Sequence, residues 1–221
     1  MRERRQMTKI RYLGGSCVEI IGLREHVIID PVYYEDPIEG VNIILISSDN
    51  PDHFQLKHLQ QIMDKFTESE NNNLQIYGPK SIKKKLKTIG RADQLKSIKT
   101  RGNLLESDLN IKAFNLTCRK EKKCHGFTIT KRNVSILCTS SSISFSNRVK
   151  KIMNDVDYAF IPSFEDHNQV YFDFLLSINP KVIFPYHFKP GQEEAAKRMT
   201  EYMTEMGLRT SFIEIGTEFE F

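Results

Sequence analysis

Three short segments of this 221-residue chain carry side chains that could bind a metal ion or transfer protons. Asp52 and His53 close a polar loop that directly follows the apolar run 42–46, His187 lies near the C-terminus, and 165–167 read Glu-Asp-His, the densest ionisable triplet. Imidazole and carboxylate groups hold zinc and similar ions, which lower the pKa of a bound water to ~7. Side chains of these types are the ones that a metal-binding site would need.

The first segment has the sequence pattern of strand, loop and helix. The apolar run 42–46 predicts a strand buried on both faces, and apolar residues recur at helical spacing over 56–66. The polar loop between them, 47–53, is therefore expected at the carboxyl end of a strand, a common place for functional residues. An alternative for Asp52 is that it only caps this helix. Asp30, at another strand end, is expected to form a structural turn or to accept a hydrogen bond behind the site.

The remaining pattern consists of two β-rich halves, each of which also supplies helices. This arrangement favours an α+β fold with two packed sheets and helices on both outer faces, a four-layer αββα sandwich. A single doubly wound sheet is the alternative. The expected strands are 9–13, 17–21, 26–30, 42–46, 74–77, 111–116, 126–130, 134–138, 158–161, 182–185 and 209–215, and the expected helices are 56–66, 80–89, 149–153, 171–178 and 193–206.

Four segments, in order, resemble motifs of the metallo-β-lactamase superfamily, especially its small single-domain hydrolases similar to ascorbate-6-phosphate lactonase. Residues 10–20 resemble the first hairpin, 28–31 (Ile-Ile-Asp-Pro) an "IDP" element, 42–54 the strand and loop that carry "THxHxDH", and 185–188 (Pro-Tyr-His-Phe) the closing "PxHY" element. The resemblance covers nearly the whole chain. It implies the αββα fold, a cleft that contains Asp52, His53 and His187, and metal-dependent hydrolysis.

The chain departs from the family's two-metal motif at several ligand positions. Ser48 and Asn50 stand where the family has its first two histidines, and Ser141 stands where it has the bridging aspartate. The third histidine falls near 117–118, which reads Thr-Cys. Neutral hydroxyl and amide oxygens are poor substitutes for these ligands. The resemblance therefore implies at most one divalent ion, zinc or manganese, held by Asp52, His53 and His187, or no ion at all.

Two functional hypotheses follow. In the first, the chain is a divergent hydrolase in which one ion activates water against an ester, a lactone or a phosphoester of a small or phosphorylated substrate. Asp52 would then be catalytic, and Asp166 or His167, which the resemblance places on the rim of the site, would take over water activation or a ligand position. The alternative is that 165–167 merely open a helix. In the second hypothesis, the chain is catalytically inactive and binds a ligand, a nucleic acid or a protein.

The cysteines and the basic tracts each have two interpretations. Cys118, Cys124 and His125 could form a soft metal site, but a structural role with all four cysteines reduced is favoured. The tracts 83–87 and 119–123 are rich in lysine and arginine. They are either solvated faces or a surface that binds nucleic acid. Neither tract contains interleaved aromatic residues for stacking on bases, so a nucleic-acid partner is not favoured.

Composition restricts the remaining function classes. The chain is 39% hydrophobic and 27% charged with a net charge of +4, which predicts a folded globule without the concentrated basic charge of a dedicated nucleic-acid binder. No apolar run approaches the ~20 residues of a membrane span, and no secretory signal opens the chain. We expect a single domain over 1–221, with 1–7 as a disordered lead-in, in the cytoplasm. The oligomeric state stays open.

Overall fold

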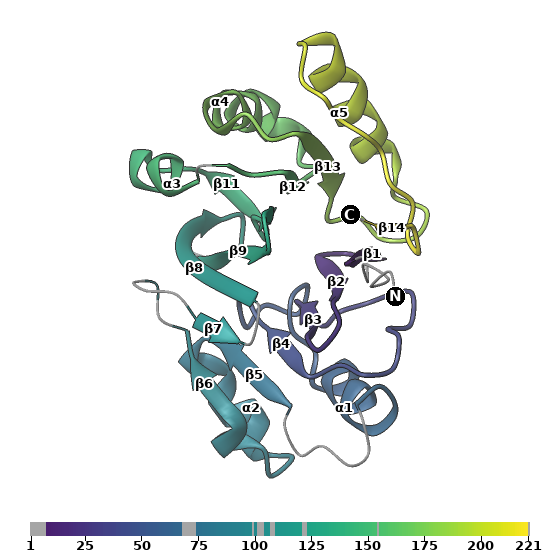
Figure 1. Cartoon of the computed structure of the whole chain (residues 1–221), viewed down its shortest axis with the longest axis vertical. Coiled ribbons are helices and arrows are strands. Elements are labelled where there is room, and N and C mark those ends of the chain that lie inside the picture. The colour runs from purple at the N-terminus through teal and green to yellow at the C-terminus, as the bar shows by residue number, and fades with distance from the viewer. Residues whose placement is uncertain are drawn as a thin grey trace, which may run out of the picture.

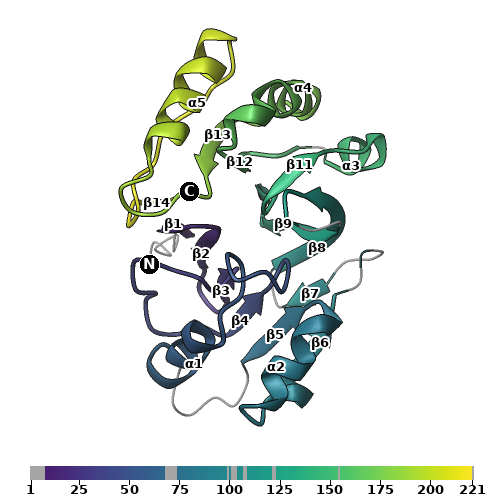
Figure 2. The same cartoon turned by 180° about the vertical axis from the view of Figure 1, so that it is seen from behind.

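The computed structural model describes residues 8–67, 74–98, 100, 104–106, 109–120, 123–153 and 155–220. The expected lead-in 1–7 lies outside them. Two sheets pack face to face and helices cover their outer surfaces (Figures 1 and 2). The predicted four-layer sandwich is confirmed, and the doubly wound alternative is wrong. None of the described helices has both the length and the apolar character needed to cross a bilayer.

The first sheet has the strand order β14-β1-β2-β3-β4-β5-β6. The β1, β2 and β3 strands form an antiparallel meander, after which β3, β4, β5 and β6 run parallel. The elements of this half are β1 (Lys9–Gly14), β2 (Cys17–Ile21), β3 (His26–Ile29), β4 (Ile43–Leu45), α1 (Leu56–Lys65), β5 (Gln75–Gly78), α2 (Lys83–Lys87) and β6 (Leu95–Ser97), with 3-10 turns at Lys80–Ile82 and Ala92–Gln94.

The second sheet has the order β11-β8-β9-β10-β12-β13, with β7 paired to β8. Its β10, β12 and β13 strands are parallel, so their carboxyl ends meet at one edge. The elements of this half are β7 (Leu104–Glu106), β8 (Leu109–Cys118), β9 (Cys124–Lys131), β10 (Val134–Cys138), β11 (Ser142–Ser144), α3 (Asn147–Ile152), β12 (Tyr158–Pro162), α4 (Asn168–Ile178), β13 (Val182–Tyr186) and α5 (Glu194–Glu205), with a 3-10 turn at Glu165–His167. After α5 the chain returns to the first sheet, where β14 (Glu218–Glu220) pairs with β1.

Three apolar clusters separate the four layers. The central cluster joins the inner faces of the sheets, for example Ile43 and Leu45 of β4 with Phe160 of β12. A second cluster packs α3, α4 and α5 on one sheet, and a third packs α1 and α2 on the other. The β4 strand contributes to two clusters because alternate side chains point to opposite faces. This explains its continuous apolar run.

The predicted elements were wrong mainly near the C-terminus. The segment 209–215 is not a strand: Thr210 makes one isolated bridge to Ile183, and the edge strand is β14, farther along the chain. The short strands β6, β7 and β11 were missed. These errors lie at sheet edges, where pairing with a neighbour decides the conformation more than the local apolar pattern does.

Candidate functional site

The candidate site lies where parallel strands of both sheets end. Asp30 follows β3, the loop 47–53 follows β4, the turn 139–141 follows β10, Phe164 follows β12 and His187 follows β13. Crevices outside the carboxyl ends of parallel strands are the usual ligand sites of α/β sheets. Here a cavity of about 280 Å³ opens at this edge. Its polar lining includes Asn50, Asp52, His53, Arg119, Lys120, Ser141, His187 and Lys189.

Tyr12 and Gly15 attach the first hairpin to the end of β13. The Tyr12 hydroxyl donates to the carbonyls of Gly15 and Phe188, at 3.0 and 3.2 Å, and the Gly15 amide donates to the Phe188 carbonyl at 2.7 Å. Gly15 has φ +58°, and a Cβ there would lie 3.3 Å from the carbonyl oxygen of Val32. A side chain would therefore be strained and crowded at this position. These contacts hold His187 beside the hairpin.

The three residues expected in the cleft, Asp52, His53 and His187, all line this one cavity, and the imidazole centroids of His53 and His187 are 5.2 Å apart. Asp52 does not cap the helix that follows, because α1 begins at Leu56 with Gln55 as its N-cap. That alternative is wrong.

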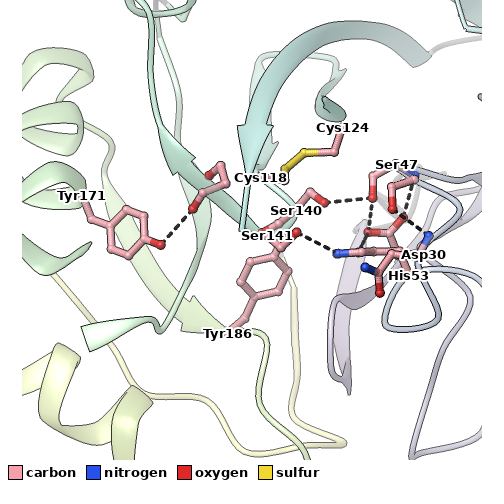
Figure 3. Close-up of a disulfide and its surroundings, with 12 residues drawn as sticks. Asp30, Ser47, His53, Cys118, Cys124, Ser140, Ser141, Tyr171 and Tyr186 are labelled. Carbon is pink, nitrogen blue, oxygen red and sulfur yellow. Dashed lines mark hydrogen bonds and ion pairs between the residues drawn. A yellow bond between two sulfur atoms is a disulfide. The ribbon is translucent and has the colours of Figure 1, made fainter. Parts of the chain in front are cut away.

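His53 is hydrogen-bonded on both ring nitrogens (Figure 3). Its Nδ1 lies 2.8 Å from Oδ2 of Asp30, and its Nε2 lies 3.0 Å from Oγ of Ser141. Asp30 also accepts hydrogen bonds from the amide and hydroxyl of Ser47, at 2.7 and 2.8 Å. The carboxylate therefore fixes the imidazole from behind the cavity, which is the acceptor role expected for Asp30.

Cationic side chains surround the cavity carboxylate. Lys120 donates a hydrogen bond to Asp52, and Nζ of Lys189 lies 4.0 Å from the same carboxylate. Burial acts to raise the pKa of Asp52, but the hydrogen bond and charge of Lys120, with His187 and Lys189, lower it overall. Arg119 stacks on Phe164, 4.7 Å from the ring centroid. The lining thus contains three cationic side chains and one carboxylate, and two of the three, Lys120 and Lys189, approach that carboxylate.

His187 is half-buried at the cavity, and its imidazole is expected to be neutral at pH 7. Desolvation, with the neighbouring His53, lowers its pKa to about 3. Its Nε2 is buried and has no hydrogen-bond partner among the described residues, although the residue lines the cavity. Burying a polar atom without a partner costs roughly 1–3 kcal/mol. A ligand with a hydrogen-bonding group near this atom would remove that cost.

These residues do not fit a divalent cation. In the part of the chain that the structure describes, no group of three or more His, Cys, Asp or Glu side chains is arranged to hold a metal ion. His53 already uses both nitrogens, and Asp52 is paired with Lys120. A divalent ion would also meet the repulsion of the neighbouring lysines. The donor set instead suits an anion.

The rim segment lies differently from the expectation. Asp166 is exposed and pairs with Arg119 at 3.2 Å, and His167 lies 3.6 Å from Asp166. Neither residue lines the cavity, although the adjacent Phe164 does. Glu165 turns away to pair with Arg198 of α5. A catalytic role for Asp166 and His167 stays a prediction.

The expectation of four reduced cysteines is wrong for one pair. Cys118, at the end of β8, and Cys124, at the start of β9, form a disulfide (Figure 3). Cys17 and Cys138 are free and buried. Disulfide sulfurs are not thiolate ligands, so a soft metal site with His125 is excluded in this structure. The disulfide closes the loop that carries Arg119 and Lys120 into the site.

Sequence reasoning missed Lys120, Arg119 and Lys189 as cavity residues. The first two belong to a basic tract that the sequence assigns to a solvated face or a nucleic-acid surface, and only the pairing of β8 with β9 places them at the cleft. Lys189 gave a weak signal, because it follows His187 by two residues.

Residues 9–187 match the family model of the beta-lactamase superfamily domain. The chain belongs to this superfamily. A novel metallo hydrolase from Ignicoccus hospitalis, Igni18, has 14% identity and a TM-score of 0.75, covering 97% of this chain and 98% of that one. The metallo-beta-lactamase fold protein YhfI from Bacillus subtilis has 10% identity and a TM-score of 0.71, covering 97% of this chain and 100% of that one.

The short form of human tRNase Z has 15% identity to this superfamily member and a TM-score of 0.65, covering 96% of this chain and 98% of that one. At such identities the likeness shows the fold alone. No curated protein sequence matches the chain.

Proposed function

We propose that this superfamily member binds a small anionic molecule, phosphorylated or carboxylated, in the cleft of Asp52, His53 and His187, without a resident metal ion. The observation that carries the proposal is the charge of the lining, which contains three cationic side chains, Arg119, Lys120 and Lys189, and a single carboxylate. A cleft lined mainly by one sign of charge concentrates ligands of the opposite sign. The neutral, unpartnered Nε2 of His187 adds a hydrogen-bonding position at the same cavity.

The metal-dependent alternative keeps one zinc or manganese ion on Asp52, His53 and His187. It requires Asp52 to leave Lys120 and His53 to release the Ser141 hydroxyl. Neither change is assisted by the neighbouring charges, because Lys189 also approaches the Asp52 carboxylate. The metal-free site is therefore the better supported of the two.

The size of the cavity favours a small ligand over a nucleic acid. Its volume of about 280 Å³ is close to the lower end of small-molecule pockets. Human tRNase Z shares this fold, but here the second basic tract, on α2, lies on the outer face of the first sheet. A small phosphorylated or carboxylated molecule is the class that we propose.

Calorimetric titration with inorganic phosphate and with glucose 6-phosphate tests the proposal. We expect binding that weakens as salt is added, because the attraction is electrostatic. Replacement of both cavity lysines, Lys120→Met with Lys189→Met, should weaken binding by about tenfold or more, since a charge-assisted hydrogen bond contributes roughly 1.5–3 kcal/mol. The matched control is Lys84→Met, which removes one exposed lysine on α2 and should leave binding unchanged.

Metal analysis of protein purified without chelator or metal affinity resin separates the alternatives. Titration with zinc and manganese should give no site that depends on His53 and His187. One tightly bound equivalent that disappears in His187→Asn would overturn the metal-free proposal. Binding of a single-stranded RNA that Lys84→Met weakens more than the double variant does would overturn the small-molecule class.

A further inference from the structure

We propose that Ser141, His53 and Asp30 form a metal-independent nucleophilic site that cleaves small carboxylic esters. Nε2 of His53 lies 3.0 Å from Oγ of Ser141, and its Nδ1 lies 2.8 Å from the Asp30 carboxylate (Figure 3). A hydroxyl beside an imidazole that is itself oriented by a carboxylate is the arrangement that activates serine for acyl transfer. The preference for an anionic ester rests on the function proposed above, but the nucleophilic site does not.

The hydrogen bonds around Asp30 determine which ring nitrogen of His53 carries the proton. A carboxylate only accepts, so Nδ1 of His53 donates to Asp30 and Nε2 is left as the acceptor for the Ser141 hydroxyl. Asp30 cannot turn away easily, because the amide and hydroxyl of Ser47 donate to its two oxygens at 2.7 and 2.8 Å. The imidazole is therefore held in the tautomer that a general base requires.

The turn after β10 presents Ser141 to the cavity. Ser140 has φ +54°, a left-handed conformation that is uncommon for serine and often marks a functional turn. The turn is fixed by a hydrogen bond from the Tyr186 hydroxyl to the Ser140 carbonyl at 3.2 Å, and by another from the Arg119 amide to the Ser141 carbonyl at 3.0 Å. Ser141 is 7% exposed and lines the cavity, whereas His53 behind it is 1% exposed.

The reaction balances without a metal or a redox partner. The Ser141 oxygen bonds to the ester carbonyl carbon as its proton passes to Nε2 of His53. The C–O bond to the alcohol then breaks, and the alcohol leaves with that proton. Water attacks the acyl-serine by the same route, which releases the acid and restores Ser141. Arg119, Lys120 and Lys189 line the same cavity and supply positive charge toward the developing oxyanion.

A neutral active-site reagent tests the nucleophile separately from anion binding. Diisopropyl fluorophosphate reacts with an activated serine, forming a P–O bond as the P–F bond breaks and fluoride leaves. We expect the intact mass to show one adduct, and peptide mapping to place it on Ser141. The Ser141→Ala variant should not react. The control Ser144→Ala, at an exposed position of β11, should react like the parent.

Removal of the base gives a graded result. His53→Gln should slow labelling on the order of 100-fold or more, the usual contribution of a general base. Asp30→Asn should also slow it, because the amide oxygen no longer offers a full negative charge to Nδ1. Thermal unfolding shows whether each variant folds. If His53→Gln or Asp30→Asn fails to fold, the Ser141→Ala variant still tests the proposal, because it removes only one hydroxyl.

The two proposals fail in different ways. No adduct after hours with excess reagent, or an adduct on another residue, would overturn the nucleophilic site even if phosphate binds. If Ser141 is labelled but the protein does not bind phosphate, the nucleophilic site is supported and the preference for an anionic ester is overturned. If both proposals hold, the double lysine variant will lose the preference for a carboxylated over a neutral ester, and it will also be labelled more slowly, because the two lysines supply charge toward the oxyanion.

Discussion

The hydroxyl of Ser141 is hydrogen-bonded to the imidazole of His53 across the junction of the two sheets, at 3.0 Å. His53 belongs to the loop after β4 in one sheet, and Ser141 to the turn after β10 in the other. In the family motif, the position of Ser141 carries the aspartate that bridges two metals. Here a neutral serine occupies that position, and a row of hydrogen bonds runs from Asp30 through His53 to the Ser141 hydroxyl at the cavity.

Reduction of the Cys118–Cys124 disulfide should lower the free energy of unfolding by ~2 kcal/mol, from the entropy of a short closed loop. It should also weaken phosphate binding, because the loop carries Arg119 and Lys120. Urea unfolding with and without reductant measures the first effect. The variant Cys118→Ala with Cys124→Ala should show no further response to reductant.

The remaining thiols provide the control for that experiment. Burial raises the pKa of Cys17 and of Cys138 well above its usual value, so neither should react with iodoacetamide in the folded protein. Two thiols should react after unfolding without reductant. Four reactive thiols under that condition would contradict the disulfide.

Acid should destabilise the protein partly through His187. Desolvation and the nearby His53 lower its pKa to about 3, whereas the unfolded imidazole titrates near 6.5. Between these two pH values the unfolded state therefore binds one more proton than the folded state. The contribution of His187 to the free energy of unfolding is fully present above about pH 6.5 and is lost as the pH falls toward 3. One such group contributes at most about 1.4 kcal/mol per pH unit.

The midpoint of urea unfolding between pH 7 and pH 5 measures this contribution, since most carboxylates stay ionised there. His187→Asn should reduce the slope of stability against pH. Burial also lowers the pKa of His58 and of His125, so part of the slope should remain. A slope identical to that of the parent would show that His187 is not buried in its neutral form.

The rim residues are tested by Asp166→Ala with His167→Ala. Asp166 is exposed and contacts Arg119 outside the cavity lining, so the double variant should change phosphate affinity by less than about threefold, as for other exposed ion pairs. Its ester hydrolysis should stay near that of the parent. A loss of hydrolysis with unchanged phosphate binding would support the catalytic role that the sequence predicts for these residues.

The sequence alone determined the frame of the site. The apolar run of β4, the polar loop and the amphipathic α1 are local patterns, and periodicity encodes them directly. The two β-rich halves predicted the four-layer fold, and the resemblance to the metallo-β-lactamase superfamily implied a common cleft for Asp52, His53 and His187, which the structure brings together. For Asp30 the sequence left two roles open, a structural turn or an acceptor behind the site, and the structure shows the acceptor.

Only the tertiary structure decided what these side chains contact. Ser141 meets His53 across 88 residues, and Lys120 meets Asp52 across 68. Such pairs depend on how two sheets pack and on which strands are neighbours, and neither is written in local hydrophobic spacing. The antiparallel pairing of β8 with β9 joins Cys118 to Cys124 and places Arg119 and Lys120 at the cleft. The charge of the cavity is therefore a property of the packed sheets, because hydrogen-bond partners and solvent exclusion exist only after folding.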